Sequence, residues 1–235
     1  MSKTDTFRPA QGPDYFGLLK AMHQTLKPAL YLEVGSRTGN SLAMATGDFI
    51  AVDPTFVLKR FTTFQGQQGH LFQMTSDAFF ESGFLQAMNR KVDFGFLDGM
   101  HHFEFLLRDF MNAERLSAPG ATLTLHDCCP FNANMTERDR DNVRGRAWTG
   151  DVWKVIPILM ELRPDLEITV YDAAPTGIVS ITNLDPESRV LNDAYDDLMD
   201  RYTTLDIETY GASRFYDLFE YADSADYIAQ VTADE

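Results

Sequence analysis

The sequence predicts an α/β fold built on one open, mostly parallel sheet. Short apolar segments alternate with segments whose apolar residues recur at helical spacing, which is typical of parallel strands joined by right-handed helical crossovers. A glycine-bearing turn follows the first apolar segment, at the place where open α/β sheets bind nucleotides. The chain of 235 residues is long enough to bury one sizeable core.

Seven apolar segments are predicted as strands. They are Ala29–Val34, Phe49–Val52, Leu71–Met74, Val92–Leu97, Ala121–His126, Glu167–Tyr171 and Gly177–Thr182. The turn-like sequence DAAPT joins the last two segments. Antiparallel strands can be joined by such a short turn, whereas parallel strands need a long crossover. The last strand is therefore expected to be antiparallel, in a pair at the edge of the sheet.

Helical spacing predicts helices between and around these strands. They are Asp14–Leu26, Ser41–Thr46, Asp77–Met88, Phe103–Leu116 and Asp151–Leu162. Asp14 and Asp151 are expected to cap the helices that they begin, and Pro157 is expected to kink the last one. Two acidic helices with aromatic faces are expected in Pro186–Glu235. The chain is thus divided into an N-terminal arm and helix (1–28), a central domain (29–184) and an acidic helical extension (185–235).

The net charge of −15 is concentrated in the last third of the chain. Residues 1–150 carry 15 basic and 16 acidic side chains, whereas residues 151–235 carry 5 and 19. No nucleic-acid partner is expected, because such binding needs a basic face. The acidic third is interpreted as a solvated surface, with a homodimer contact or another interaction surface as the alternatives.

Nothing in the sequence resembles a membrane span or a secretion signal. No apolar run approaches the ~20 residues that cross a bilayer, and the first residues lack an apolar core. The adjacent Cys128 and Cys129 provide no disulfide framework and lack the C-x-x-C spacing of zinc sites. A soluble, cytoplasmic protein with no membrane partner is expected.

The turn after the first predicted strand is the candidate cofactor site. It lies in the segment YLEVGSRTGNS, Tyr31–Ser41. Gly35 and Gly39 allow a close approach of the backbone to a ligand. The dinucleotide pattern G-x-G-x-x-G is absent, and the carboxylate of Glu33 suits a cationic ligand better than a pyrophosphate. Contacts to the cofactor are predicted for Glu33, Gly35, Ser36, Gly39, Asn40 and Ser41.

Acidic residues follow the next two predicted strands. Asp53 lies roughly 20 positions after the turn, where a carboxylate accepts hydrogen bonds from ribose hydroxyls. Thr75, Ser76 and Asp77 end the third strand, where they would meet an adenine edge. The alternative is that these are ordinary turns in a sheet that binds nothing.

With these segments the chain resembles class I S-adenosylmethionine-dependent methyltransferases. The resemblance is to bacterial methyltransferase domains with an Asp-Gly-x-His motif after strand four, and covers roughly Ala29–Leu184. It is carried by YLEVGSRTGNS, AVDP, FLDGMHHF, LSAPGATLTLHD and GDVWKVIPIL. It implies a Rossmann-like, seven-stranded sheet with an antiparallel last strand. It also implies that S-adenosyl-L-methionine contacts the residues equivalent to Glu33, Gly35, Gly39, Asp53 and Asp77.

Two further strand ends carry side chains suited to chemistry. Asp98 and His101 follow the fourth predicted strand, and His126 and Asp127 end the fifth. Parallel strands share one direction, so these side chains are expected to converge beside the cofactor turn, with Asp98 also contacting the cofactor. One interpretation is a divalent metal, Mg²⁺ or Mn²⁺, held by Asp98, Asp127 and His126. Another is that these side chains merely cap strand ends.

His101 is the predicted general base, because an imidazole accepts a proton near neutral pH. The motif is similar to that of O-methyltransferases acting on macrolide sugars, and this resemblance implies roles in metal binding or catalysis for Asp98, His101 and Asp127. His126 departs from it, because those relatives carry Glu there. His102 is expected to cap the next helix or to face solvent.

The loop after the fifth strand is the candidate substrate side. Arg138, Arg140, Arg144 and Arg146 crowd the sequence TERDRDNVRGRAW, with Trp148 at its end. The arginines would pair with an anionic group and Trp148 would stack on a ring. In the alternative, Glu137, Asp139 and Asp141 neutralise the arginines within the loop.

Together these patterns predict transfer of a methyl group from S-adenosyl-L-methionine to a hydroxyl of a small molecule, such as a sugar or secondary metabolite. Asp98 and His101 are the predicted catalytic residues. A non-catalytic interaction module on the same fold and an NAD-dependent oxidoreductase are the alternatives. The acceptor itself is left open, because substrate loops vary most in such folds.

Overall fold

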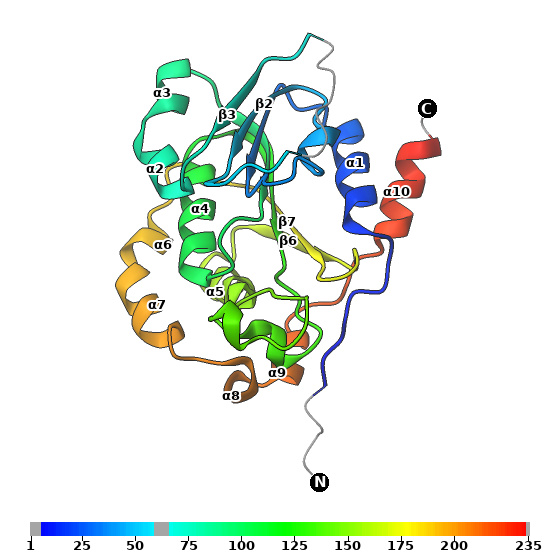
Figure 1. The fold of residues 1–235 in the computed structure, drawn as a ribbon, viewed down its shortest axis with the longest axis vertical. Coiled ribbons are helices and arrows are strands. Elements are labelled where there is room, and N and C mark those ends of the chain that lie inside the picture. Colours follow the sequence, from blue (N-terminus) through cyan, green and yellow to red (C-terminus); the bar gives the residue numbers. More distant parts are fainter. Residues whose placement is uncertain (1–5, 59–65, 234–235) are drawn as a thin grey trace.

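The computed structural model describes residues 6–58 and 66–233. These residues form one seven-stranded sheet with helices packed against it (Figure 1). The strand order is β3-β2-β1-β4-β5-β7-β6. The first five strands are parallel, and β7 is antiparallel to both of its neighbours, β5 and β6. The predicted α/β fold, with a mostly parallel sheet and an antiparallel last strand, is confirmed.

The strand positions follow the predicted apolar segments. The strands are β1 (Leu30–Val34), β2 (Asp48–Val52), β3 (Gly69–Phe72), β4 (Val92–Leu97), β5 (Ser117–His126), β6 (Glu167–Tyr171) and β7 (Ile178–Thr182). All five residues of β1 are buried, so the strand is one continuous apolar run apart from Glu33. β3 begins two residues before the predicted Leu71–Met74. It is an edge strand of exposed and half-buried residues, so its apolar pattern does not mark its start.

Helices cover both faces of the sheet (Figure 1). On one face lie α1 (Tyr15–Leu26) and α10 (Ser224–Ala233); on the other lie α2 (Ser76–Glu81), α3 (Phe84–Met88), α4 (Phe103–Arg115) and α5 (Val155–Leu162). Alternate residues of β1 join different cores: Leu32 packs with α4, and Tyr31 packs with α1. The predicted cap of α1 is confirmed, because the side chain of Asp14 accepts a hydrogen bond from Phe16 N (3.0 Å).

Two predicted helices differ in the structure. The segment Asp77–Met88 is two short helices, because Gly83 between them adopts a left-handed conformation (φ +69°) that ends the first. The segment Ser41–Thr46 is a single 3₁₀ turn, Leu42–Met44. Other 3₁₀ turns are Ala133–Thr136, Arg140–Asn142 and Val152–Lys154.

The predictions for Asp151 and Pro157 were wrong. Asp151 makes no side-chain cap for the helical segment that follows it; its Oδ1 accepts a hydrogen bond from Phe103 N (2.9 Å) and so caps α4, far away in sequence. Pro157 lies in the first turn of α5, where no helical N–H partner is required, so it does not interrupt the helix.

The C-terminal segment forms more helices than the two predicted. Within its described residues these are α6 (Val190–Asp193), α7 (Tyr195–Tyr202), α8 (Ile207–Tyr210), α9 (Ala212–Tyr216) and α10. Gly211 (φ +95°) separates α8 from α9. The ring of Phe215 lies 5.7 Å from that of Trp153, so this segment shares the core of the sheet.

The predicted segments 1–28, 29–184 and 185–235 each include a few residues that the structure does not describe. Residues 1–5 of the arm and 234–235 of the extension are not described. The division itself stays a prediction. None of the described helices is long and apolar enough to cross a membrane.

Candidate active site

Gly35 brings the first and fourth strand ends into contact. It follows β1 with φ +92°, and its N–H donates to Val52 O (2.8 Å). A Cβ at Gly35 would lie 1.8 Å from the carbonyl oxygen of Asp98. Glycine is therefore required here by the approach of the protein's own backbone, as well as by the dihedral angle. The predicted cofactor turn and the predicted catalytic strand end are direct neighbours.

Glu33 lies behind this turn and is fully buried. Its Oε2 accepts a hydrogen bond from Tyr31 Oη (2.7 Å), and its Oε1 accepts one from Ser41 Oγ (2.9 Å). Burial raises the pKa of Glu33 to about 7, although these two hydrogen bonds act to lower it. The carboxyl is thus anchored by hydroxyl groups, and its predicted contact with a cationic cofactor stays a prediction.

Asp53 joins the turn to the end of β2. Its Oδ2 accepts a hydrogen bond from Arg37 N (2.9 Å), and its Oδ1 accepts one from Thr55 N (2.7 Å). Each carboxylate oxygen can accept a further hydrogen bond, so the arrangement leaves acceptor capacity for ribose hydroxyls. Of the other predicted contacts, Ser36 is buried, Gly39 has a left-handed φ of +74°, and Asn40 is exposed.

Asp77 already has a strong partner in the structure. Arg108 of α4 donates to both of its oxygens, from Nε (2.9 Å) and from Nη2 (2.7 Å). Arg108 also donates to Tyr195 Oη (2.7 Å), which ties α2, α4 and the C-terminal segment together. A contact of Asp77 with adenine, which stays a prediction, would have to share the carboxylate with this bidentate pair.

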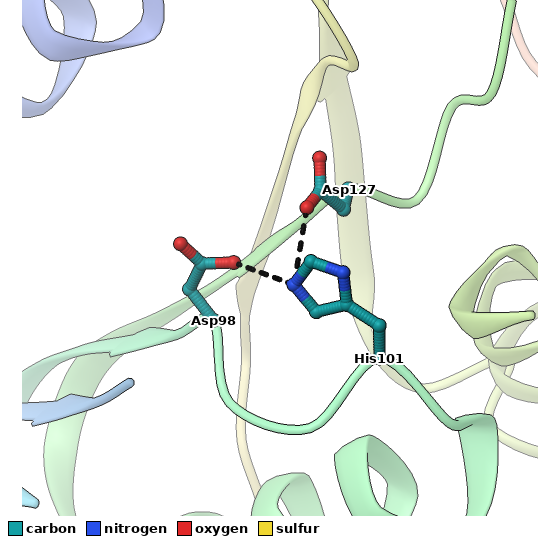
Figure 2. Close-up of side chains that lie close together, drawn as sticks. All are labelled: Asp98, His101 and Asp127. Atoms are coloured by element: carbon teal, nitrogen blue, oxygen red, sulfur yellow. Dashed lines mark ion pairs between the residues drawn. The ribbon is translucent and has the colours of Figure 1, made fainter. Parts of the chain in front are cut away.

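Asp98, His101 and Asp127 converge at the carboxyl ends of β4 and β5, as Figure 2 shows. His101 Nε2 lies between the two carboxylates, 3.3 Å from Asp127 Oδ2 and 3.7 Å from Asp98 Oδ1. One ligand atom from each of the three residues lies within 4.8 Å of the others. The predicted convergence of these strand ends is thus present in the structure.

The other ring nitrogen of His101 faces the backbone. Nδ1 lies 2.8 Å from Trp148 O, and a carbonyl only accepts, so Nδ1 carries a proton and Nε2 is the nitrogen that exchanges one. Burial acts to lower the pKa of His101, but the carboxylates of Asp98 and Asp127 outweigh it and raise that pKa. The ring of Trp148 lies 4.9 Å from the His101 ring, so the loop after β5 covers this histidine.

His126 faces the same two carboxylates from the end of β5. Its Nδ1 lies 3.2 Å from Asp98 Oδ1 and 3.6 Å from Asp127 Oδ1. Burial acts to lower the pKa of His126, but Asp127 and Asp98 raise it to about 9. Burial likewise acts to raise the pKa of Asp98, but His126 and His101 hold it well below its usual range. Two imidazoles and two carboxylates therefore stabilise each other's charged forms.

Two further residues at this site carried no signal in the sequence. Tyr15, which begins α1, places its ring 4.2 Å from the His126 ring. Burial and the nearby Asp98 and Asp127 raise the pKa of the Tyr15 hydroxyl, so it stays protonated. Thr176, in the β6–β7 turn, donates from Oγ1 to Asp127 Oδ1 (2.6 Å). Both lie far from β4 and β5 in sequence, so no local pattern could find them.

The arginine loop is only partly neutralised. Arg138 pairs with Glu104 and with Asp151, each at 2.5 Å, rather than with acidic residues of its own loop. In residues 6–58 and 66–233, Arg144 and Arg146 have no carboxylate within ion-pair distance. His102 lies outside the charged cluster, with Nε2 2.9 Å from Arg138 O.

Comparisons with known proteins agree with this architecture. Residues 32–128 match the family model of a methyltransferase domain. The matched segment contains the turn, Asp53, Asp77, the Asp98–His101 segment and Asp127. No curated protein matches the sequence. The match covers less than half of the chain, and together with the sheet order it supports the predicted Rossmann-like methyltransferase fold.

Solved structures with a similar fold have low sequence identity to this chain. Cofactor-bound Rv0187 from MTB is 13% identical with a TM-score of 0.50, covering 72% of this chain and 78% of that one. An O-methyltransferase from Bacillus cereus in complex with SAH is 14% identical with a TM-score of 0.48, covering 78% and 84%. The O-methyltransferase TomG from Streptomyces achromogenes, in complex with SAM, is 14% identical with a TM-score of 0.47, covering 72% and 78%.

Proposed function

We propose that this chain, a class I methyltransferase by its domain match and its fold, transfers a methyl group from S-adenosyl-L-methionine to a hydroxyl of a small molecule. The observation that carries the proposal is the position of the Asp98–His101–Asp127 group. Asp98 provides both the carbonyl against which Gly35 packs and the carboxylate that faces His101. A proton-accepting site therefore lies directly beside the cofactor turn.

The turn suits a cationic cofactor. Glu33 lies behind it, and the hydroxyl of Tyr15 is close to the carboxylates of Asp98, Asp127 and Glu33. Carboxylates beside the turn favour a sulfonium and an ammonium group over a pyrophosphate. S-adenosyl-L-methionine, when bound, supplies a methyl carbon that an oxygen lone pair attacks, while the electrons of the carbon–sulfur bond pass to sulfur. The predicted contacts from Glu33 to Ser41, and from Asp53 and Asp77, are part of this proposal.

His101 takes the proton of the acceptor hydroxyl. Trp148 O holds the proton on Nδ1, so that Nε2 receives the transferred one. Asp98 and Asp127 then stabilise the imidazolium, since both lie within 3.7 Å of Nε2. Trp148 lies over His101 and forms one wall for the acceptor. In-line alignment of hydroxyl and methyl supplies the remaining part of catalysis.

The same residues fit a divalent cation, Mg²⁺ or Mn²⁺. The carboxylates of Asp98 and Asp127 and the imidazole of His101 offer ligand atoms within 4.8 Å of one another. Asp98 and Asp127 would hold the ion, and His126, whose Nδ1 faces both, is the third ligand in this proposal. A cation here would bind the acceptor hydroxyl and lower its pKa. His101 Nε2 also faces the cation position, and one nitrogen cannot bind a metal and accept a proton at once.

Titration calorimetry with S-adenosyl-L-methionine tests the proposal first. The cofactor-free chain is expected to bind it, and failure to bind would remove the proposed function. Turnover of a hydroxyl compound that the enzyme methylates, measured in EDTA, then distinguishes a cation site from a metal-free site with His101 as the base. Loss of activity in EDTA, with recovery on adding Mn²⁺, supports the cation site. Full activity in EDTA contradicts metal assistance and leaves His101 as the base.

A further inference from the structure

We infer that Thr176 is a positioning residue, which orients the carboxylate of Asp127 within the Asp98–His101–Asp127 group. The turn between β6 and β7, residues 172–177, carries it to the end of β5. This inference rests on the cation site of the proposed function. It gives the antiparallel β6–β7 pair a role in assembling that site.

The backbone at Asp127 leaves its side chain dependent on a partner. Asp127 follows β5 in a left-handed conformation (φ +60°), which costs a non-glycine residue about 1 kcal/mol. Thr176 Oγ1 donates to Asp127 Oδ1 at 2.6 Å, and Thr176 O accepts a hydrogen bond from Cys129 N at 2.9 Å. Thr176 therefore binds the chain at two points around this conformation. Asp127 Oδ2 is left facing His101 Nε2.

Thr176 also connects Asp127 to His126. Its Oγ1 lies 3.4 Å from His126 Nε2. Since the hydroxyl proton goes to Asp127, the hydroxyl oxygen is free to accept a hydrogen bond from His126 Nε2. His126 Nδ1 in turn lies 3.2 Å from Asp98 Oδ1. The hydroxyl is thus one link in a chain of hydrogen bonds that reaches both carboxylates. Thr176 is only 2% exposed, so these hydrogen bonds are shielded from water.

The turn that carries Thr176 is held by both ends of the chain. Ala174 N donates to Pro13 O (2.8 Å), and Ala174 O accepts a hydrogen bond from Tyr15 N (3.0 Å). On the other side, Asp172 Oδ1 accepts hydrogen bonds from the backbone N (2.9 Å) and Oγ (2.7 Å) of Ser224, the first residue of α10. The position of the Thr176 hydroxyl is therefore fixed by the N-terminal segment and by the acidic C-terminal segment together.

The test is Mn²⁺ binding to the full-length chain, measured by calorimetry without acceptor, alongside S-adenosyl-L-methionine binding. Thr176→Val keeps the shape of the side chain and removes the hydroxyl, whereas Thr176→Ser keeps the hydroxyl. Partners of metal ligands typically change metal affinity about 10- to 100-fold. We expect Thr176→Val to weaken Mn²⁺ binding by at least about 10-fold, with binding of S-adenosyl-L-methionine unchanged. Thr176→Ser should retain Mn²⁺ binding close to that of the wild type.

Thr182→Val is the matched control. Thr182 lies in the same β6–β7 pair and donates to Glu167 Oε2 (3.0 Å) on the surface, so its variant should bind Mn²⁺ like the wild type. Equal Mn²⁺ affinity of Thr176→Val and the wild type overturns the inference. If the wild type binds S-adenosyl-L-methionine but no Mn²⁺, the cation site and this role of Thr176 are both wrong, while the cofactor assignment stands. If it binds neither, the proposed function itself fails.

Discussion

The cofactor turn and the rim formed by the ends of β4 and β5 lie side by side, yet they are built differently. In the turn, the carboxyl of Glu33 is held by uncharged hydroxyls from its own neighbourhood, Tyr31 and Ser41. At the rim, Asp98 and Asp127 face the imidazoles of His101 and His126. Burial raises the pKa of Glu33 although these hydroxyls act to lower it, whereas the carboxylates and imidazoles of the rim stabilise each other's charged forms. This contrast agrees with the proposed roles, in which the turn receives the cationic cofactor and the rim exchanges a proton or holds a metal.

The largest effect is expected at Gly35, where the two regions touch. Gly35→Ala would place a Cβ 1.8 Å from Asp98 O, at a residue with φ +92°. Unfolding in urea should show a loss of about 3 kcal/mol or more, with loss of S-adenosyl-L-methionine binding. Gly66→Ala is the control, because Gly66 has the same φ and no atom of the described residues lies within 4 Å of its Cβ position. It should cost only about 1 kcal/mol. Equal losses in the two variants would show that the contact with Asp98 does not matter.

A change confined to the rim should separate chemistry from cofactor binding. His101→Ala is expected to lower kcat by about 10²- to 10⁴-fold while the affinity for S-adenosyl-L-methionine stays the same. His102→Ala is the matched control, because that neighbouring histidine faces Arg138 O instead of the carboxylates. Where activity persists in EDTA, the wild-type rate should rise with pH through the raised pKa of His101, since the base must be deprotonated. A His101→Ala enzyme with the kcat of the wild type would show that His101 is not the general base.

The two regions should also lose stability in different pH windows. The pKa of Glu33 is raised from 4.5 to about 7, so its folded form favours the proton and stability falls as pH rises between these values. The pKa of His126 is raised from 6.5 to about 9, so its contribution is complete below 6.5 and is lost as pH rises to about 9.

Urea unfolding in EDTA at a series of pH values checks this. Glu33→Gln should reduce the loss between pH 4.5 and 7, and His126→Gln should remove the loss between 6.5 and 9. Buried Asp109, whose pKa burial raises to about 7, also contributes in the lower window, so Glu33→Gln reduces that loss without abolishing it. Identical pH profiles for the wild type and both variants would contradict the assignment.

The smallest effect is expected within the turn. Ser41→Ala removes the hydroxyl that donates to Glu33 Oε1 and should cost about 1 kcal/mol of unfolding free energy, with a weaker affinity for S-adenosyl-L-methionine. Ser82→Ala is a control outside the turn, because its hydroxyl donates to Phe79 O (2.6 Å). That variant should lose stability without a change in cofactor affinity. If calorimetry shows that Ser41→Ala binds the cofactor as tightly as Ser82→Ala does, the Ser41–Glu33 contact has no role in cofactor binding.

The parts of the site that the sequence predicts are those set by strand direction. Buried parallel strands are continuous apolar runs, so their ends could be located, and with them Glu33, Asp98 and Asp127. The reason for Gly35 could not be predicted, because the carbonyl that excludes a side chain belongs to Asp98, at the end of another strand.

Contacts between distant segments account for what the sequence did not predict. Asp151 has the residue type of an N-cap for its own helix, yet it caps α4, because the loop after β5 returns to the start of that helix. Thr176 and Tyr15 reach the site from other segments of the chain. In the C-terminal segment, aromatic spacing indicated helices, but Gly211 divides a region that spacing alone would leave continuous.

The cofactor assignment is tested by calorimetric titration of S-adenosyl-L-methionine into the cofactor-free, full-length chain. One molecule is expected to bind per chain, with a Kd on the order of micromolar, and no comparable binding of NADH is expected. Absence of S-adenosyl-L-methionine binding by the folded wild-type chain, or tighter binding of NADH, would contradict the assignment.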